Sequence, residues 1–138
     1  IKHTGDETVL DEKSGFLEGR PLNSGEESYY ELPAVSEQSV SLYEHCVRSV
    51  KHGLRFGDHG LPLMGSGDWN DGMDKVGIEG KGESVWLAFF LYDVLIRFEA
   101  VAALRKDTDF AGFCKKEARL LSRNIDTHSW DGAWYRRA

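Results

Sequence analysis

Apolar residues recur at helical spacing in three segments of the chain. From Ser36, a suitable N-cap, they repeat every three or four residues as far as Leu54, which predicts an amphipathic helix. A second helix is predicted over about 83–104, and it is apolar on nearly every side. A helix without a polar face needs cover on both sides, so we expect it to lie in the inner wall of a larger helical assembly.

A third helix is predicted after residues 107–109, with Thr108 as its cap. Its expected buried stripe consists of Phe110, Phe113, Cys114, Ala118, Leu121 and Ile125. Between residues 13 and 36, by contrast, three glycines and two prolines interrupt any helical period, which indicates an extended, packed loop. Because no strong alternating strand pattern appears, the sequence predicts an all-α fold class.

Composition restricts the function classes. The 138 residues carry a formal charge of -6, and 41% are hydrophobic, which fits one folded domain and not a disordered tail. The acidic balance argues against a nucleic-acid partner and against docking on an anionic membrane. The longest apolar run, 85–96, is too short to span a bilayer. The chain begins at Ile1 without Met, so we expect a piece of a longer, cytoplasmic protein.

The two cysteines, Cys46 and Cys114, are far apart in sequence and have no Cys-x-x-Cys spacing. Such spacing would be needed for a zinc ribbon or a redox pair. Each lies in a predicted helix, where a free thiol packs as a small hydrophobic group. We therefore expect two reduced, buried thiols.

The connection over residues 57–83 holds the candidate chemistry. It contains eight glycines, and a long loop in a compact helical domain is usually functional. Its core, Gly67-Asp68-Trp69-Asn70-Asp71-Gly72-Met73-Asp74, combines carboxylates, an amide and an indole. Trp69 offers a flat apolar face to a pyranose ring, and Asp68 and Asn70 match sugar hydroxyls. A nearby carboxylate would raise the pKa of Asp71, and a protonated acid suits protonation of a glycosidic oxygen.

Two other interpretations of the same residues remain open. A calcium loop would use Asp68, Asn70 and Glu79, but glycine falls one place before the position that this motif requires. Alternatively, the acidic residues are solvated turn formers and caps. Near the loop, His52 and His59 have no second ligand at metal spacing and are expected to be surface or hydrogen-bonding histidines. Lys81 and Glu83 are expected to orient the loop or begin the following helix.

The glycine-rich connection resembles a known family. The stretches Gly60-Leu61-Pro62-Leu63-Met64-Gly65-Ser66-Gly67-Asp68-Trp69-Asn70-Asp71-Gly72-Met73 and Gly80-Lys81-Gly82-Glu83-Ser84-Val85-Trp86-Leu87 resemble the inverting β-glucoside phosphorylases of the glycoside hydrolase family 94 type. The likeness is greatest to the phosphorylase domain of cyclic β-1,2-glucan synthases and to β-1,2-oligoglucan phosphorylases. Phe16 to Leu22, Leu42 to Cys46 and Trp130 to Arg137 fit the same group.

The resemblance implies a fold, a reaction and site residues. The fold would be an (α/α)6 toroid, of which residues 1–138 form a partial catalytic domain with an active-site loop at 57–83. Asp71 would be the general acid, Trp69 would line the sugar site, and Asp68 and Asn70 would contact sugar or hold the loop. Phosphate would attack the anomeric carbon of a β-glucan and release α-glucose 1-phosphate. The resemblance implies inorganic phosphate as co-substrate and no metal or cofactor.

The chain is shorter than a complete toroid, which needs about twelve helices. We therefore expect the isolated segment to be inactive, to need the remainder of the barrel and to self-associate through exposed apolar surface. The longer protein could be anchored in the bacterial inner membrane. The alternative from a different class is a non-catalytic carbohydrate-binding or scaffold domain that retains the loop.

Overall fold

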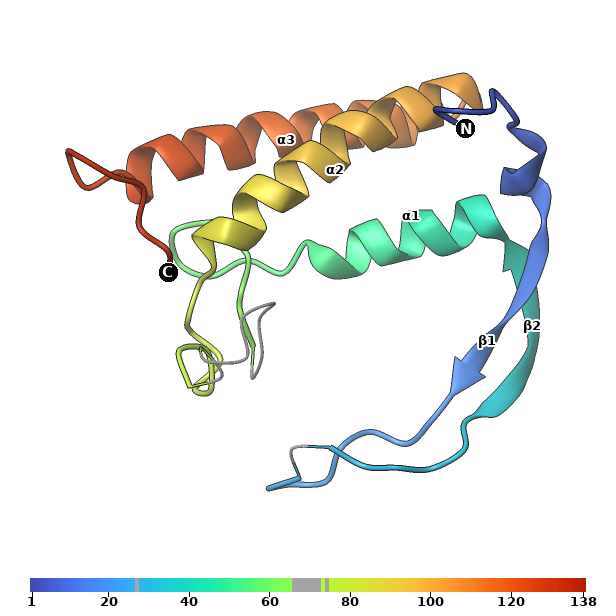
Figure 1. Cartoon of the computed structure of the whole chain (residues 1–138), viewed down its shortest axis with the longest axis horizontal. Helices are drawn as coiled ribbons and strands as arrows, with labels where there is room; N and C mark the ends of the chain where they lie inside the picture. The colour runs from blue at the N-terminus through green and yellow to red at the C-terminus, as the bar shows by residue number, and fades with distance from the viewer. Residues whose placement is uncertain (27, 66–72, 74) are drawn as a thin grey trace. The chain divides into compact units, whose positions relative to one another are not determined.

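The computed structural model describes residues 1–26, 28–65, 73 and 75–138 and divides into two compact units, residues 1–52 and 53–138. The first unit contains a short 3₁₀ helix η1 (Thr8–Asp11), strands β1 (Lys13–Glu18) and β2 (Ala34–Ser41), and nearly all of helix α1 (Leu42–Gly53). The second contains helices α2 (Val85–Leu104) and α3 (Thr108–His128) (Figure 1).

Strands β1 and β2 form an antiparallel two-stranded sheet in the first unit (Figure 1). The register pairs Lys13 with Ser41 at one end and Glu18 with Ala34 at the other, with an irregularity between Gly15 and Leu17. The expected all-α class is therefore wrong, because the described chain is mixed α/β. Strand pairing joins residues that are distant in sequence, and the irregularity breaks the alternation by which a strand is recognised.

The start of the first helix also differs from the prediction. Helix α1 begins at Leu42, and the Ser41 hydroxyl accepts a hydrogen bond from the Glu44 N–H at 3.2 Å. The predicted cap, Ser36, lies inside β2. The helical spacing of apolar positions extended backwards to Val40, but pairing with β1 decides the conformation of this stretch.

The connection between the strands is organised by Arg20. Its guanidinium forms ion pairs with Glu26 at 2.6 Å and Glu31 at 3.1 Å and lies 4.2 Å from the centre of the Tyr29 ring. The Arg20 hydrogen bond lowers the pKa of the Glu26 carboxyl, and the N–H of Asn23 acts in the same direction. The expected extended loop is thus held by charged contacts over part of its length, between β1 and β2.

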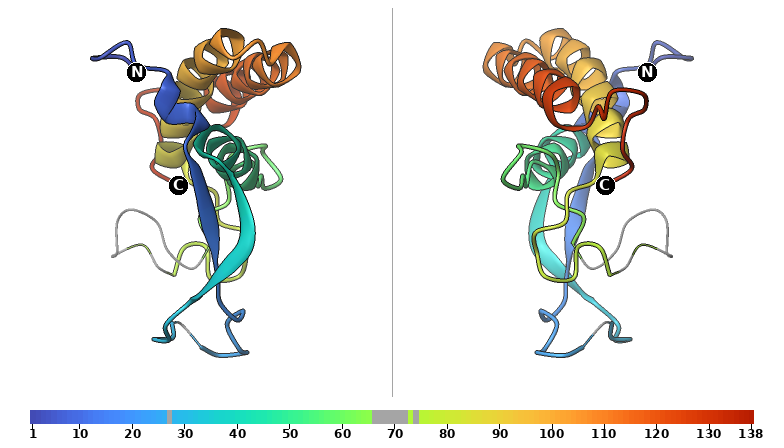
Figure 2. Two further views of the ribbon diagram at one scale, coloured as in Figure 1. Left: turned by 90° about the vertical axis from the view of Figure 1, so that its right-hand side faces the viewer. Right: turned by 90° about the vertical axis from the view of Figure 1, so that its left-hand side faces the viewer.

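Helices α2 and α3 lie side by side and form the core of the second unit (Figures 1 and 2). The Ser84 hydroxyl caps α2 by accepting from the Leu87 N–H at 3.1 Å, and the Asp107 carboxylate caps α3 by accepting from the Phe110 N–H at 3.0 Å. The predicted cap Thr108 is instead the first helical residue. The Ser84 and Asp107 side chains thus accept from backbone N–H groups that have no partner within the first turn of a helix.

The packed faces of these helices follow the sequence prediction closely on α3 and less closely on α2. Of the expected α3 stripe, all members are buried except Phe113, which is half-buried. On α2, one face is buried, whereas Trp86, Phe89 and Phe90 are between 40% and 55% exposed. The described chain therefore covers only one side of the helix that was expected to need cover on both. The buried residues of α2 are Val85, Ala88, Leu91, Leu95 and Ala102.

Both cysteines are free thiols, as predicted. Cys114 of α3 is fully buried, and burial raises the pKa of its thiol to about 11. Cys46 on α1 is only half-buried, so the expectation of two buried thiols holds for one of them. Among the described helices, none combines the length and apolar character that crossing a membrane requires.

Candidate functional site

Two backbone segments, residues 62–65 and 76–84, lie together where the glycine-rich connection meets the rest of the unit. They are called the two legs, and their paired residues 62–64 and 82–84, together with the turn at 57–61, are called the loop base. The Met64 N–H donates to the Gly82 carbonyl at 2.8 Å, and the Ser84 N–H donates to the Pro62 carbonyl at 2.8 Å. Between these bonds, Leu63 and Glu83 form an antiparallel bridge. Residues 62–64 and 82–84 are thus paired.

Glycine is required at two close approaches of backbone in this connection. A Cβ on Gly77 would lie 2.8 Å from the Gly65 nitrogen and would collide with the Gly65 carbonyl oxygen. A Cβ on Gly82 would collide in the same way with the Val76 carbonyl oxygen. The opposing atoms are backbone and cannot move aside as a flexible side chain could. The glycine content of this connection therefore has a packing cause at these two positions.

The residues predicted to perform the chemistry belong to the segment between the legs. Asp68, Trp69, Asn70 and Asp71 lie outside the described residues, and so does Asp74. Their assignment as acid and sugar-binding groups stays a prediction. The calcium alternative shares Asp68 and Asn70, and among the described residues no cluster of three metal-ligating side chains occurs.

The Glu83 carboxylate is the polar centre of the described part of this region. One oxygen accepts from the backbone N–H groups of His59 and Leu61, each at 3.1 Å. The other lies 2.6 Å from Nδ1 of His59. The Glu83 side chain is only 10% exposed, so these bonds replace water that it has lost. The expectation that His59 forms hydrogen bonds is confirmed. Glu83 contacts the turn at 57–61, and the expectation that Lys81 and Glu83 orient the loop or begin the helix stays a prediction.

Three further hydrogen bonds join the loop and the start of α2 to α3 and to the C-terminal segment. Asn124 of α3 donates from Nδ2 to the Gly60 carbonyl at 3.0 Å. Arg137 donates from Nη1 to the Ser84 hydroxyl at 3.2 Å, and the Val85 N–H donates to the Arg137 carbonyl at 3.2 Å. The loop base is therefore fixed by both the α3 helix and the C-terminal segment. Sequence reasoning missed Asn124, because its partner lies 64 residues earlier and no local pattern signals the contact.

A cavity of about 280 Å³ lies beside Glu83. His59 and His128 form part of its wall, with ring centres 5.1 Å apart. The lining brings imidazole, ammonium, guanidinium and carboxylate groups together with three apolar side chains. The lining residues are His59, Leu61, Lys81, Glu83, Val85, His128, Arg136 and Ala138.

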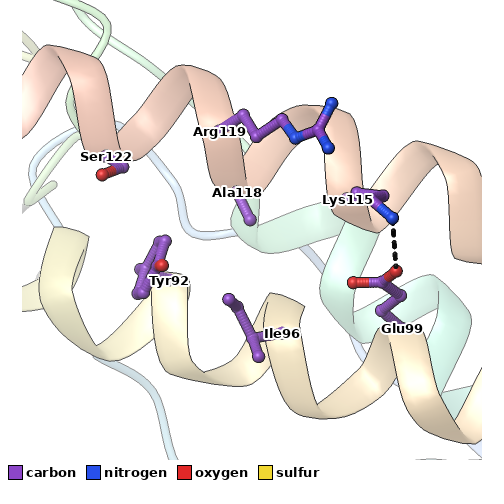
Figure 3. Close-up of a pocket in the computed structure, with 7 residues that line it drawn as sticks. All are labelled: Tyr92, Ile96, Glu99, Lys115, Ala118, Arg119 and Ser122. Carbon is purple, nitrogen blue, oxygen red and sulfur yellow. Dashed lines mark ion pairs between the residues drawn. The ribbon is translucent and has the colours of Figure 1, made fainter.

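A second cavity, of about 340 Å³, lies in the groove between α2 and α3 (Figure 3). Tyr92, Ile96 and Glu99 face it from α2, and the ion pair between Glu99 and Lys115 at 3.6 Å closes one end. Only helix residues line it, and none of the loop residues 57–84 contributes. Its position therefore gives no link to the predicted chemistry.

Comparison with known proteins connects this loop to an enzyme family. The family described as Glycosyl hydrolase 94 superfamily, catalytic domain, matches residues 2–138. The cyclic β-(1,2)-glucan synthase NdvB of Rhizobium meliloti (strain 1021) is 39% identical over 135 residues, which cover 97% of this chain and 5% of the relative.

Two relatives from Paenibacillus borealis are phosphorylases by name. Solabiose phosphorylase is 29% identical over 98% of this chain and 16% of its own length. The 3-O-β-D-glucopyranosyl-β-D-glucuronide phosphorylase is 34% identical over 72% of this chain and 13% of its own length. The chain thus spans well under a fifth of the length of each of these relatives.

Proposed function

Because the chain belongs to the catalytic-domain family of the Glycosyl hydrolase 94 superfamily, we propose that it is part of an inverting glycoside phosphorylase. The reaction is reversible phosphorolysis of a β-linked glucan to α-glucose 1-phosphate. The observation that carries this proposal is the family match over nearly the whole chain, including the Asp68 to Asp71 motif. The relatives named as phosphorylases support the reaction type.

The proposed mechanism needs one carboxylic acid. An inverting hydrolase uses a second carboxylate to activate water, whereas phosphate is already an anionic nucleophile. Asp71 would protonate the leaving glycosidic oxygen while phosphate attacks the anomeric carbon from the opposite face. Trp69 would stack on the sugar ring, and Asp68 and Asn70 would bind hydroxyl groups or hold the loop. Inorganic phosphate is then a co-substrate, and the proposal includes no metal or organic cofactor.

We further propose that the preferred substrate is a β-1,2-glucan. The relative named as a cyclic β-(1,2)-glucan synthase is 39% identical, whereas solabiose phosphorylase and cellobionic acid phosphorylase are 29% and 28% identical over similar lengths. Since these relatives are much longer, activity is proposed for the longer protein that includes this segment, and not for residues 1–138 alone. The remainder of the catalytic domain would supply the phosphate site and cover the exposed face of α2.

The direct test is phosphorolysis by the full-length protein. Phosphate would be supplied with β-1,2-, β-1,3- or β-1,4-linked glucose oligomers, and α-glucose 1-phosphate would be followed by phosphorus NMR. We expect product from the β-1,2 series alone. Asp71→Asn should lower kcat by about 10²-fold or more, which is the range expected for loss of a general acid. Asp58→Asn, an exposed carboxylate earlier in the same connection, is the matched control.

Two results would change the conclusion. Product from another linkage would overturn the β-1,2 preference and leave the reaction type in place. A folded protein that binds oligosaccharide but gives no product from any linkage would replace the enzyme by the carbohydrate-binding alternative. Full turnover in Asp71→Asn would remove Asp71 as the acid.

A further inference from the structure

Glu83 links three parts of the loop base through one side chain. Its carboxylate accepts from two backbone N–H groups, at His59 and Leu61, and contacts the His59 ring at 2.6 Å. Its own backbone forms the bridge with Leu63 between the two legs. Glu83 therefore connects the turn at 57–61 to the start of the leg that leads into the predicted catalytic motif.

The neighbouring backbone is shaped to admit this carboxylate. A Cβ on Gly57 would lie 2.7 Å from both Cγ and Oε1 of Glu83, so the space at this position is occupied by the glutamate side chain. The Gly57 N–H donates to the Leu61 carbonyl at 3.0 Å, which closes the turn around Glu83. The Glu83 side chain has little room to adopt another rotamer while the turn keeps its conformation.

We infer that Glu83 is a positioning residue for the proposed reaction. It holds residues 57–63 against the start of α2, at the base of the connection that carries the proposed acid Asp71. The inference rests on the proposed function, since it requires that Asp71 is the acid. Glu83 acts through the loop base, and it is assigned no contact with substrate.

Chemistry makes the carboxylate difficult to replace at this site. The single oxygen of a glutamine can accept from the backbone N–H groups of His59 and Leu61, but an amide N–H group then replaces the acceptor oxygen that lies 2.6 Å from Nδ1 of His59. Glu83→Gln therefore removes the acceptor from the His59 contact and the negative charge from all three contacts. The resulting shift of the loop base need only be small to matter, because a misplacement of about 1 Å can cost about 10²-fold in rate.

The test compares two leaving groups in the full-length enzyme. A β-linked glucose oligomer has a poor leaving group that needs protonation, whereas a 2,4-dinitrophenyl β-glucoside has a leaving group that departs without it. We expect Glu83→Gln to lower kcat on the oligomer by about 10- to 100-fold, with KM nearly unchanged. On the dinitrophenyl substrate the loss should be under about threefold, as for Asp71→Asn. Glu37→Gln, at an exposed carboxylate on β2, should leave both reactions unchanged.

A second variant keeps the inference testable if Glu83→Gln does not fold. His59→Gln removes the ring contact but leaves the backbone bonds to Glu83, so it should show the same leaving-group dependence with a smaller loss in kcat. Amide hydrogen exchange at Leu61 should accelerate in Glu83→Gln, whether or not the substrate is turned over.

The outcomes separate the two proposals. Equal losses on both substrates, or a change confined to KM, would overturn the positioning role of Glu83. An active wild type that Asp71→Asn inactivates and Glu83→Gln does not would overturn the inference alone. Wild-type inactivity on every substrate would overturn the proposed function and, with it, this inference.

Discussion

The side-chain amide of Asn124 donates a hydrogen bond to the carbonyl oxygen of Gly60 at 3.0 Å. Asn124 lies on α3 and Gly60 in the turn that precedes the predicted catalytic motif, so the contact ties that turn to the helical core. A Cβ on Gly60 would collide with the Asn124 amide, and Gly60 has a φ of +68°, which favours glycine. The turn and the helix are therefore fitted to each other at both residues.

Replacing Asn124 by alanine should remove this hydrogen bond without disturbing α3. We expect the free energy of unfolding to fall by about 1 kcal/mol, the usual net value of one hydrogen bond, because alanine favours the helix but leaves the Gly60 carbonyl without this donor. Urea unfolding measures the change. Lys116→Ala, an exposed site on α3, is the control, and an equal loss there would contradict the assignment.

The two fully buried serines of the described chain should respond oppositely to alanine. Ser84 caps α2 and accepts from the Leu87 N–H and from Arg137, so Ser84→Ala should cost about 1–2 kcal/mol. Among the described residues, the buried Ser129 hydroxyl has no hydrogen-bond partner. Ser129→Ala should therefore leave stability unchanged or raise it by a few tenths to about 1 kcal/mol.

Thermal unfolding of the two serine variants in parallel tests this difference. Each change removes the same single oxygen atom from a fully buried side chain, so each variant is the control for the other. A loss of more than about 1 kcal/mol in Ser129→Ala would show that its hydroxyl has a partner. Equal melting temperatures in the two variants would contradict the capping role of Ser84.

The cysteines should differ sharply in reactivity towards an alkylating reagent. Cys114 is fully buried, and burial raises its pKa to about 11, so at pH 8 only about one thiol in a thousand is ionised. Cys46 is half-buried and its pKa is also raised by burial, but it remains partly accessible. Iodoacetamide labelling followed by mass spectrometry should modify Cys46 first and Cys114 only after unfolding. Rapid labelling of Cys114 in the folded protein would contradict its burial.

The helical core was predictable from sequence because its signal is local. The buried stripe on α3 follows a three- and four-residue period, and the structure buries most of it as expected. Helix starts were harder, since Asp107 and Thr108 are both good caps and only geometry decides between them. The two strands were missed because pairing between residues 13–18 and 34–41 leaves little trace in either stretch alone.

The candidate site was predictable in its chemistry but not in its supports. The Asp68 to Asp71 motif indicates sugar chemistry from residue types alone, and it stays a prediction because these residues lie outside those described. Glu83 and His59 were recognised as polar neighbours of the loop, but their direct contact joins residues 24 positions apart. Asn124 and Gly60 are still further apart, and no spacing rule connects them.

The turn after α3 should weaken as pH falls, because it is held by an ionised carboxylate. Asp131 accepts from the N–H groups of Trp134 at 2.8 Å and Ala133 at 2.9 Å, and these bonds lower the pKa of its carboxyl below the ordinary 3.8. A pKa lowered by folding stabilises the folded turn above the ordinary pKa, and that contribution is lost as pH falls through the lowered value. An NMR titration that follows the amide protons of Ala133 and Trp134 should give a midpoint below 3.8. Asp131→Asn, with no titrating carboxyl, should abolish the transition, and a wild-type midpoint above 3.8 would exclude stabilisation of the ionised form by these bonds.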